Sequence, residues 1–451
     1  YTRTTGIWQT VWLEPVPAAC RLERPRITPD VGGSRLIVEQ PLVGDRRGLR
    51  VRAMLGDARG CAAMAECDAA SDFIPRLVLE IPADRVRLWS PDDPHLYDLE
   101  IELLNADGAT VDRATSYAGL RSVTIDGPAI LINGRTIFQR LVLDQGYYPD
   151  GIMTAPSDEA LWRDIELSLA VGFNGARLHQ KVFEERFLYH ADRMGYLVWG
   201  EFPDWGCRSD RDGRPWQEPD AAYVTQWLEA LARDYSHPSI VGWCPLNETC
   251  QETTDEITTL DDVTRGMFLA TRAMDATRPV IDASGYSHRV PEADVYDSHD
   301  YSQDVALFRA RHDATSQGQL FVNTGKDGQP WSIPWRGQPV MVSEFGGTWW
   351  QPGAPPDESS WGYGQRPRTV DEFYERFEGL CGALLDNAAL CGYCYTELTD
   401  VYQEQNGLYG FDRAAKFDVS RLRAIQQRPA AIERRTASGG HDNGPDREGK
   451  R

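Results

Sequence analysis

The first part of the chain shows the two-residue period of β-strands. Apolar and polar positions alternate along several short runs between about residues 16 and 125, and turn residues separate the runs. These runs are RLIVEQPL, GLRVRAML, RLVLEIP, YDLEIELL and ATVDRATSY. Such alternation is typical of strands that bury one face, and the stretch from Asn105 to Gly108 predicts a hairpin between the last two runs. The pattern therefore predicts a β-sandwich over this span.

From about residue 137 onward, short apolar strands alternate with longer amphipathic segments. The candidate strands are FQRLVL, NGARL, YLVWGEF, SIVGWCPL, PVIDAS, DVYDSH, QPVMVSEF and CGYCYTEL. Helices are predicted over 157–171, 221–235, 261–276 and 369–390. The first has Ser157 as its N-cap and an apolar stripe at Leu161, Ile165 and Leu169. Eight strands joined by crossovers over roughly 260 residues favour a (β/α)8 TIM barrel over the alternative, a doubly wound open sheet.

The predicted fold class is thus a multidomain chain of a β part followed by an α/β part. We expect the β-sandwich over 16–125 and the (β/α)8 barrel over 126–435. The final stretch, SGGHDNGPDREGKR, offers almost nothing apolar to bury, so residues 436–451 are predicted to form a disordered tail. A chain of 451 residues is long enough for two or three such domains.

The composition of the chain argues against nucleic acids and membranes as partners. The 68 acidic side chains outnumber the 47 basic ones, and a net charge of −21 repels phosphate backbones, so no nucleic-acid partner is expected. No apolar run approaches the roughly 18 residues that cross a bilayer, so no membrane partner is expected. The nine scattered cysteines favour free thiols in a reducing compartment, the cytoplasm of a bacterium. Secretion stays open, because the chain begins at Tyr1 rather than Met.

Two acidic side chains end predicted strands. The segment GWCPLNET brings an apolar strand to Asn247 and Glu248, and PVMVSEFGG brings another to Glu344. In a (β/α)8 barrel the chemistry lies at the carboxyl ends of the strands. Paired carboxylates are what cleavage of a glycosidic bond requires, although each one alone could be a solvated loop residue or part of an ion pair at the rim.

These segments resemble glycoside hydrolase family 2, the group of β-galactosidases, β-glucuronidases and β-mannosidases. RDYSHPSIVGWCPLNE (233–248) is similar to the family's acid/base segment, VMVSEFGG to its nucleophile segment, and NGARLHQKVFEERFLYHADRMGYLVWGEF to its second and third barrel strands. LWSPDDPHLYDLEIEL (88–103) resembles the end of its immunoglobulin-like domain, and ILINGRTIFQR (130–140) the start of its barrel. YTRTTGIWQTVWLE resembles the last strand of its N-terminal jelly-roll sugar-binding domain, which we place at residues 1–15. The resemblance implies that most of this jelly roll is absent here.

The resemblance implies a role for each matching residue. Glu248 is then the general acid/base and Glu344 the nucleophile of a retaining mechanism, with their carboxyls about 5–5.5 Å apart. Asn247 would bind the sugar 2-hydroxyl. Tyr301 would support the nucleophile, and Arg177 would lie beneath Glu344 and keep it ionised. We expect a raised pKa at the proton donor, from a nearby negative charge and aromatic walls.

The chain also departs from the family pattern. The family's R-x-x-H is one residue shorter here, so His179 could either contact sugar or cap a loop. The stretch YQEQNGLYG lacks the lysine that recognises a uronic acid, and Asn323–Lys326 precedes the seventh strand, so a neutral sugar is favoured. Glu201 is followed by Phe-Pro, which leaves the family's magnesium site incomplete. We therefore expect no metal and no cofactor, and Glu201 becomes a hydrogen-bonding group at the barrel mouth.

Further candidates for sugar contact lie at strand ends. Asp144 could bind sugar hydroxyls or open the loop that follows it. Trp349, Trp350 and Tyr395 are candidate walls on which a sugar ring could stack, although such residues are often packing residues. Trp205 and Trp361 lie on long loops that could shape the entrance of the pocket.

The favoured hypothesis is an exo-acting retaining β-glycosidase whose partner is a carbohydrate substrate. Galactose is the leading sugar, with β-glucuronidase and β-mannosidase activity as alternatives. The competing class is a carbohydrate-binding protein without turnover. A homo-oligomer is possible on either hypothesis.

Overall fold

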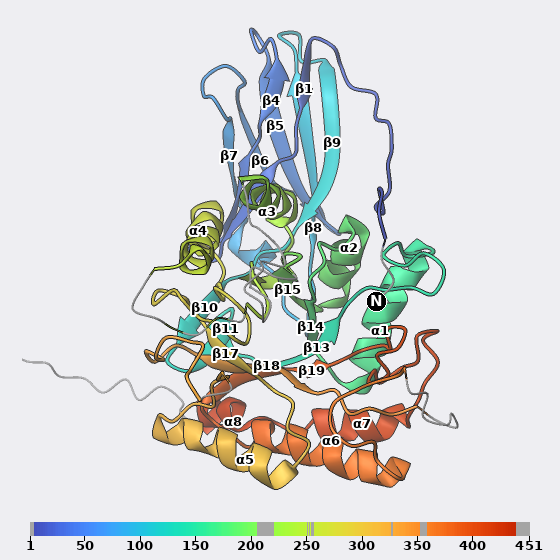
Figure 1. Cartoon of the computed structure of the whole chain (residues 1–451). Coiled ribbons are helices and arrows are strands. Elements are labelled where there is room, and N and C mark those ends of the chain that lie inside the picture. The colour runs from blue at the N-terminus through green and yellow to red at the C-terminus, as the bar shows by residue number, and fades with distance from the viewer. Residues whose placement is uncertain are drawn as a thin grey trace, which may run out of the picture.

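The computed structural model describes residues 4–204, 221–249, 251, 253, 257–325, 328–351 and 359–438. Its β-rich N-terminal part projects from one side of a larger α/β part (Figure 1). No helix in the described part of the chain is long and apolar enough to span a membrane. The cysteines of that part are free: Cys20, Cys61, Cys67, Cys244, Cys381, Cys391 and Cys394.

The N-terminal part is a sandwich of antiparallel sheets. One sheet has the order β2 (Arg26–Asp30), β3 (Arg35–Glu39), β7 (Arg76–Glu80), and the other has β6 (Gly60–Asp68), β5 (Arg50–Asp57), β8 (Tyr97–Leu104), β9 (Thr110–Ala118). A short pair joins β1 (Cys20–Leu22) to β4 (Leu42–Gly44). Buried and partly exposed residues alternate along β5, where Val51, Ala53 and Leu55 enter the core. The predicted hairpin between β8 and β9 is confirmed, with Gly108 at a φ of 81° in the turn.

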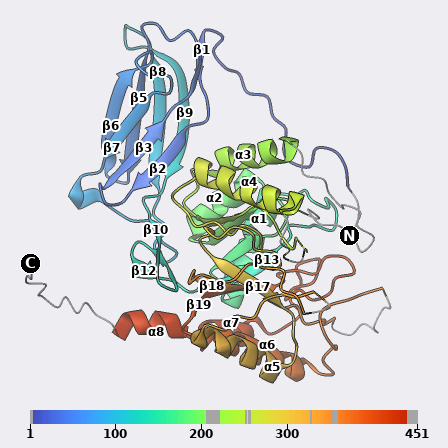
Figure 2. The ribbon, with the colours of Figure 1, turned by 60° about the vertical axis from the view of Figure 1, so that its left-hand side comes forward.

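A small sheet and a few buried side chains link the two parts. The small sheet consists of β10 (Val123–Asp126), β11 (Ala129–Ile132) and β12 (Arg135–Thr136), and it lies between the sandwich and the α/β part (Figure 2). The indole of Trp89 donates to the Asp192 carbonyl at 2.7 Å, and Arg121 Nε donates to the Pro238 carbonyl at 2.9 Å. Because Trp89 and Arg121 are buried, the sandwich is fixed against the α/β part.

The α/β part is built on a curled, seven-stranded parallel sheet. Its strands, in sheet order, are β16 (Ile240–Cys244), β15 (Leu197–Glu201), β14 (Gly175–Leu178), β13 (Gln139–Asp144), β19 (Leu390–Thr396), β18 (Val340–Gly346) and β17 (Tyr296–Asp300). All seven were predicted. The predicted fifth strand, PVIDAS at 279–284, is not a continuous strand, and two isolated parallel bridges (Trp243 with Val280, Asn247 with Ser284) join it to β16. Its irregular backbone makes too few ladder bonds to count as a strand.

Helices cover the outside of this sheet. They are α1 (Asp158–Val171), α2 (Glu185–Met194), α3 (Ala221–Asp234), α4 (Thr259–Met274), α5 (Val305–Asp313), α6 (Val370–Leu385), α7 (Val419–Gln426) and α8 (Ala431–Ser438), with the short 3-10 turn η2 (Ala314–Gln317) after α5. Another 3-10 turn, η1 (Ala83–Arg85), lies in the sandwich between β7 and β8. The four predicted helices are present, and Ser157 caps α1 as predicted by accepting from the Ala160 N–H. The predicted helix 369–390 ends early, since Leu390 already begins β19.

Two core layers follow from the alternation along the parallel strands. Side chains such as Leu141, Leu143 and Met341 point inward, where they meet Ile130 and Ile132 of β11. The alternate residues point outward and pack against the helices. The inner layer fills one end of the curled sheet and leaves the carboxyl ends of its strands for a site.

The ends of the chain add little regular structure. Residues 4–19 form neither helix nor strand, and they lie along the α/β part through bonds such as Gln9 Nε2 to the Val182 carbonyl at 2.8 Å. Helix α8 reaches Ser438, within the stretch predicted as a tail, and residues 439–451 lie outside the described part.

Candidate active site

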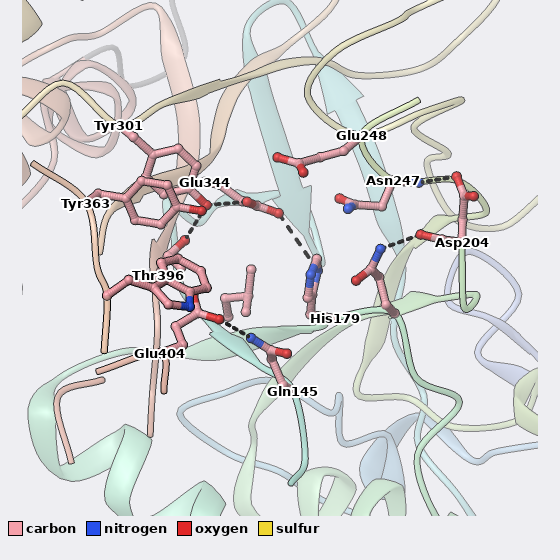
Figure 3. A pocket seen from close by; sticks show the side chains of 13 residues that line it. Gln145, His179, Asp204, Asn247, Glu248, Tyr301, Glu344, Tyr363, Thr396 and Glu404 are labelled. Carbon is pink, nitrogen blue, oxygen red and sulfur yellow. Dashed lines mark hydrogen bonds and ion pairs between the residues drawn. The ribbon is translucent and has the colours of Figure 1, made fainter. Parts of the chain in front are cut away.

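An open cavity of about 700 Å³, including its mouth, lies at the carboxyl ends of the parallel strands. Its walls come from strand ends and from the loops that follow them (Figure 3). The lining residues are Leu143, Gln145, His179, Gln180, Asp204, Asn247, Glu248, Tyr301, Glu344, Trp361, Tyr363, Thr396 and Glu404. The cavity thus includes both glutamates that the sequence singled out.

Glu248 and Glu344 approach each other closely in this cavity. One carboxylate oxygen of each, together with a ring nitrogen of His299, lie within 4.8 Å of one another. Glu248 has a φ of 50°, a left-handed conformation that is uncommon outside glycine. Its N–H donates to the Ser284 carbonyl at 2.9 Å, which holds the residue in this conformation. Backbone outliers of this kind cluster at functional sites.

Arg177 organises the base of the cavity. Its side chain is 1% exposed, and its guanidinium forms ion pairs with Glu344 Oε1 at 2.8 Å and with Glu201 Oε2 at 2.6 Å. It also donates to Oδ1 of Asn247 and, at 2.8 Å, to the Ser343 carbonyl. The buried guanidinium of Arg177 therefore fixes Glu344 and Asn247 relative to each other.

Tyr301 holds the other oxygen of Glu344. Its hydroxyl donates to Glu344 Oε2 and lies 3.2 Å from Thr396 Oγ1. The Tyr301 ring stacks on Tyr363, with 3.4 Å between centroids and 5° between planes. Burial and the charge of Glu344 raise the pKa of Tyr301 well above its ordinary value, so the phenol keeps its proton and remains a donor.

Glu201 lies beneath the cavity and does not line it. Burial opposes its ionisation, but Arg177 and His179 outweigh burial and hold its pKa at about 2. Its second oxygen accepts from the Gln180 N–H at 2.9 Å and lies 3.2 Å from His179 Nδ1. Glu201 therefore orients His179, which does line the cavity.

His299 is a site residue that the sequence analysis missed. Its Nδ1 lies 2.7 Å from Glu248 Oε1 and 3.4 Å from Glu344 Oε2. Although burial favours the neutral acid, contact with His299 lowers the pKa of Glu248, opposite to the raised pKa that we expected at the proton donor. The expectation considered only anions and aromatic walls near Glu248, whereas the structure places an imidazole against it.

The same three side chains could also hold a metal ion. Glu248, His299 and Glu344 together offer one nitrogen and two oxygen ligands within reach of a single ion. Nitrogen and carboxylate ligands of this kind suit Zn²⁺. A metal would have to displace the hydrogen between His299 Nδ1 and Glu248.

Several candidates from the sequence do not line the cavity. Asp144 lies two residues after Val142, whose side chain packs in the outer layer, so the two side chains share a face of the strand. The Asp144 carboxylate accepts from the Gly146 N–H at 2.9 Å. Burial and the charge of Asp164 raise the pKa of Asp144 to about 7. Tyr395 is fully buried among the helices, with its ring 5.0 Å from that of Phe377. Both side chains belong to the outer layer because strand residues alternate between the two faces.

The tryptophan candidates divide between the cavity and other places. Trp349 and Trp350 are half-buried outside the cavity lining, where the Arg366 guanidinium lies 6.0 and 5.8 Å from their ring centroids. Trp361 lines the cavity. Trp205, like Lys326, lies outside the described residues.

Loop residues supply much of the wall that the sequence did not predict. Gln145 follows β13, and Glu404 lies in the loop after β19. Gln145 Nε2 donates to Glu397 at 2.8 Å and lies 3.5 Å from Glu404 Oε2. The sequence could have indicated Gln145, because it directly follows a predicted strand. No sequence pattern indicates that the loop after β19 brings Glu404 to the cavity.

Comparisons with known proteins point to one family. A family model described as glycosyl hydrolases family 2 matches residues 22–121. The putative β-glucuronidase of Formosa agariphila is 27% identical over 247 residues, which cover 54% of this chain and 29% of that protein. The β-galactosidase of Vibrio cholerae is 29% identical over 202 residues, which cover 43% of this chain and 18% of that protein. The chain thus spans less than a third of the length of these curated relatives.

The fold gives an independent comparison over more of the chain. A solved structure of the β-D-glucuronidase of Dictyoglomus thermophilum superimposes with a TM-score of 0.71 at 19% identity, covering 91% of this chain and 69% of that one. The sandwich carries the family's sequence signature, and the fold likeness extends across the α/β part. The chain is therefore similar to glycosyl hydrolases of family 2 in sequence over residues 22–121, and it shares its fold with the β-D-glucuronidase structure over most of its length.

Proposed function

We propose that this chain carries the catalytic centre of a retaining exo-β-glycosidase, with Glu344 as nucleophile and Glu248 as general acid/base. One observation carries the proposal, namely that oxygens of these two carboxylates lie within 4.8 Å of each other in one cavity. Retaining glycosidases separate their carboxyls by about 5–5.5 Å, whereas inverting ones leave about 6.5–9.5 Å for a water molecule.

The contacts around the pair support these roles. Glu344 attacks the anomeric carbon while Glu248 protonates the departing oxygen, and water then releases the sugar with Glu248 as base. Arg177 and Tyr301 hold the two oxygens of Glu344 in place for this attack. Because Arg177 binds Oδ1 of Asn247, the amide nitrogen of Asn247 is the group that would donate to the sugar 2-hydroxyl.

The charge of the cavity supports a neutral sugar, with galactose as the leading candidate. Among the described lining residues, Asp204, Glu248, Glu344 and Glu404 are acidic and none is lysine or arginine. A uronic acid would bring its own carboxylate into this field without a cation to pair with. Neutral hydroxyls, in contrast, could donate to Glu404 and Gln145.

A β-glucuronidase is the second candidate, and β-mannosidase activity the third. The names of two similar proteins, from Formosa agariphila and Dictyoglomus thermophilum, favour glucuronidase. A panel of nitrophenyl β-glycosides decides between the sugars. Galactoside turnover well above glucuronide and mannoside turnover is expected, and a preference for the glucuronide would overturn the charge argument.

The same proposal extends to the architecture. We infer an immunoglobulin-like sandwich over 16–125 and a (β/α)8 barrel over 126–435, in which the bridged segment 279–284 takes the fifth strand position. The free thiols of the described cysteines are compatible with the bacterial cytoplasm, and a homo-oligomer stays part of the proposal.

Covalent trapping distinguishes an enzyme from a carbohydrate-binding protein without turnover. An activated 2-deoxy-2-fluoro glycoside should release its phenol in a burst and leave a sugar adduct on Glu344, found by mass spectrometry of the peptide. Glu344→Gln should give neither burst nor adduct. Reversible binding without any adduct in the unmodified chain would favour the binding-protein class.

A further inference from the structure

Trp361 is the most exposed of the described residues that line the cavity. Solvent reaches 36% of its surface, whereas Glu344 and Asn247, which line the same cavity, are each 3% exposed. Trp361 therefore lies toward the mouth of the cavity, and Glu344 and Asn247 lie farther in.

The backbone holds Trp361 in place, although the residue belongs to a loop. Its N–H donates to the Gln403 carbonyl at 2.8 Å, and its carbonyl accepts from the Gln405 N–H at 2.8 Å. Two residues further on, the Tyr363 N–H donates to the Gly347 carbonyl at 2.8 Å, directly after β18. A platform that is fixed in this way loses little conformational entropy when a ligand packs on it.

Trp361 also offers more uncovered aromatic surface than its neighbours in the cavity wall. Tyr301 and Tyr363 stack face to face with 3.4 Å between centroids, so each ring covers a face of the other. Trp361 does not join this stack, because its plane is turned 84° from that of Tyr363. The largest exposed aromatic surface in the described part of the wall is therefore the indole of Trp361.

An exposed indole contributes little to folding, because its apolar surface stays in contact with water. Ligand sites, in contrast, combine a few aromatic surfaces with polar groups that fix the orientation of the ligand. Polar side chains of this cavity, such as Gln145 and Glu404, can bind hydroxyls but offer no flat apolar face. The ligand group best suited to Trp361 has a flat apolar face of its own, as an aromatic ring or the C–H face of a sugar has.

The proposed exo-acting cleavage decides which part of the substrate reaches Trp361. The terminal sugar lies between Glu248 and Glu344, where its anomeric carbon is attacked. A terminal sugar carries nothing beyond its far end, so only the leaving group extends from the reacting bond toward the mouth. Trp361 therefore faces the leaving group and not the sugar that is transferred.

We propose that Trp361 is a specificity-determining residue that packs on the leaving group and selects leaving groups with a flat apolar face. The inference rests on the proposed glycosidase function. The substrate is then an aryl glycoside or a β-linked disaccharide. In the second half of the reaction the same indole holds an acceptor alcohol. The acceptor oxygen bonds to the anomeric carbon as the bond to Glu344 breaks, and the acceptor proton goes to Glu248.

The first test compares leaving groups in Trp361→Ala. The substrates are the phenyl and 2,2,2-trifluoroethyl β-glycosides of the sugar that the panel selects, and a β-linked disaccharide that ends in this sugar. We expect kcat/KM for the phenyl glycoside, the disaccharide or both to fall about tenfold or more, and that for the trifluoroethyl glycoside to change less than about threefold. The larger loss identifies an aromatic ring or a second sugar as the preferred group. Trp361→Phe, which keeps a flat face, should recover part of the loss.

The second test uses the covalent adduct, in which the transferred sugar is already bound to Glu344. A 2-deoxy-2-fluoro glycosyl fluoride, whose leaving group is a single atom, should label Trp361→Ala as fast as the unmodified chain. Normal labelling also shows that the site of the variant is folded. Benzyl alcohol or glucose should then restore activity by accepting the sugar, and the variant should need about tenfold more of the acceptor. The same acceptor dependence in both chains would overturn the inference.

Trp162→Ala is the matched control. Trp162 is 40% exposed on α1 and does not line the cavity, so its removal should leave all of these measurements unchanged. In Trp361→Ala, an equal loss on all three substrates together with slow labelling would place Trp361 against the transferred sugar, and no loss on any substrate would place it against neither group; both results overturn the inference. Failure of the proposed function would look different, since the unmodified chain would then form no adduct on Glu344 and turn over none of the substrates.

Discussion

The buried pair of Arg177 and Glu201 gives the most direct test of how this site is built. Both side chains are essentially inaccessible to solvent, and their charged atoms are 2.6 Å apart. Arg177→Met removes the cation while keeping a long side chain of similar reach. The variant leaves the Glu201 carboxylate buried without its guanidinium partner, with His179 and the Gln180 N–H as its remaining contacts, and breaking a buried pair in this way is strongly destabilising.

Two estimates of the interaction agree. The pKa of Glu201 falls from 4.5 to about 2, and at roughly 1.4 kcal/mol per pKa unit this contributes about 3 kcal/mol to folding at neutral pH. Coulomb's law for charge centres about 4 Å apart, at an effective dielectric constant of about 20, gives roughly 4 kcal/mol. Because the folded pKa is depressed, the contribution is complete above the unfolded pKa and is lost as pH falls toward 2.

Urea unfolding of four chains measures the coupling: the unmodified chain, Arg177→Met, Glu201→Gln and the double variant. We expect a coupling free energy of about 3 kcal/mol at pH 7, with the double variant more stable than Arg177→Met. At pH 3 the cost of Glu201→Gln should be smaller than at pH 7. A coupling below roughly 1 kcal/mol, or an equal cost of Glu201→Gln at both pH values, would refute the account of Glu201 as a buried anion held by Arg177.

Three further predictions concern activity. Tyr301→Phe removes a hydrogen bond to charged Glu344, so kcat/KM on nitrophenyl glycosides should fall roughly 10- to 100-fold, and an unchanged value would mean that Tyr301 does not support the nucleophile. Glu404→Gln removes one acidic group from the cavity wall, so the ratio of glucuronide to galactoside turnover should rise about tenfold or more; a constant ratio would show that the charge of Glu404 does not act on the sugar. Zn²⁺ should inhibit more strongly as pH rises, because Glu248, His299 and Glu344 can bind it only when they are deprotonated, and His299→Gln should weaken the inhibition by removing the nitrogen ligand; equal inhibition of both chains would contradict a metal site at these residues.

The sequence located those site residues that follow from strand order. An apolar run that ends in a polar side chain marks the carboxyl end of a parallel strand, and such ends meet at one edge of the sheet. This reasoning found Glu248 and Glu344, and the family resemblance added Arg177 and Tyr301. Alternation would have added His299, because residues two apart on a strand share a face and Tyr301 was already placed in the site.

Two local irregularities lay beyond that reasoning. Met341 points inward and both Val342 and Phe345 point outward, so strict alternation would turn Glu344 away from the cavity. The pairing of β18 with β19 shifts between Val342 and Phe345, and this bulge lets Glu344 face inward. The wall residues Tyr363 and Glu404 lie on loops whose course depends on tertiary contacts, such as the Trp361 N–H with the Gln403 carbonyl. Neither feature has a periodic signal in the sequence.

The buried cluster gathers acidic groups around one fixed cation. Arg177 forms ion pairs with both Glu201 and Glu344, so a single guanidinium faces two carboxylates beneath the cavity. Glu248 adds a third carboxylate at the cavity wall, where its oxygen lies 2.7 Å from His299 Nδ1. A site in which carboxylates outnumber the arginines and lysines complements the positive charge that develops on the sugar ring in the transition state.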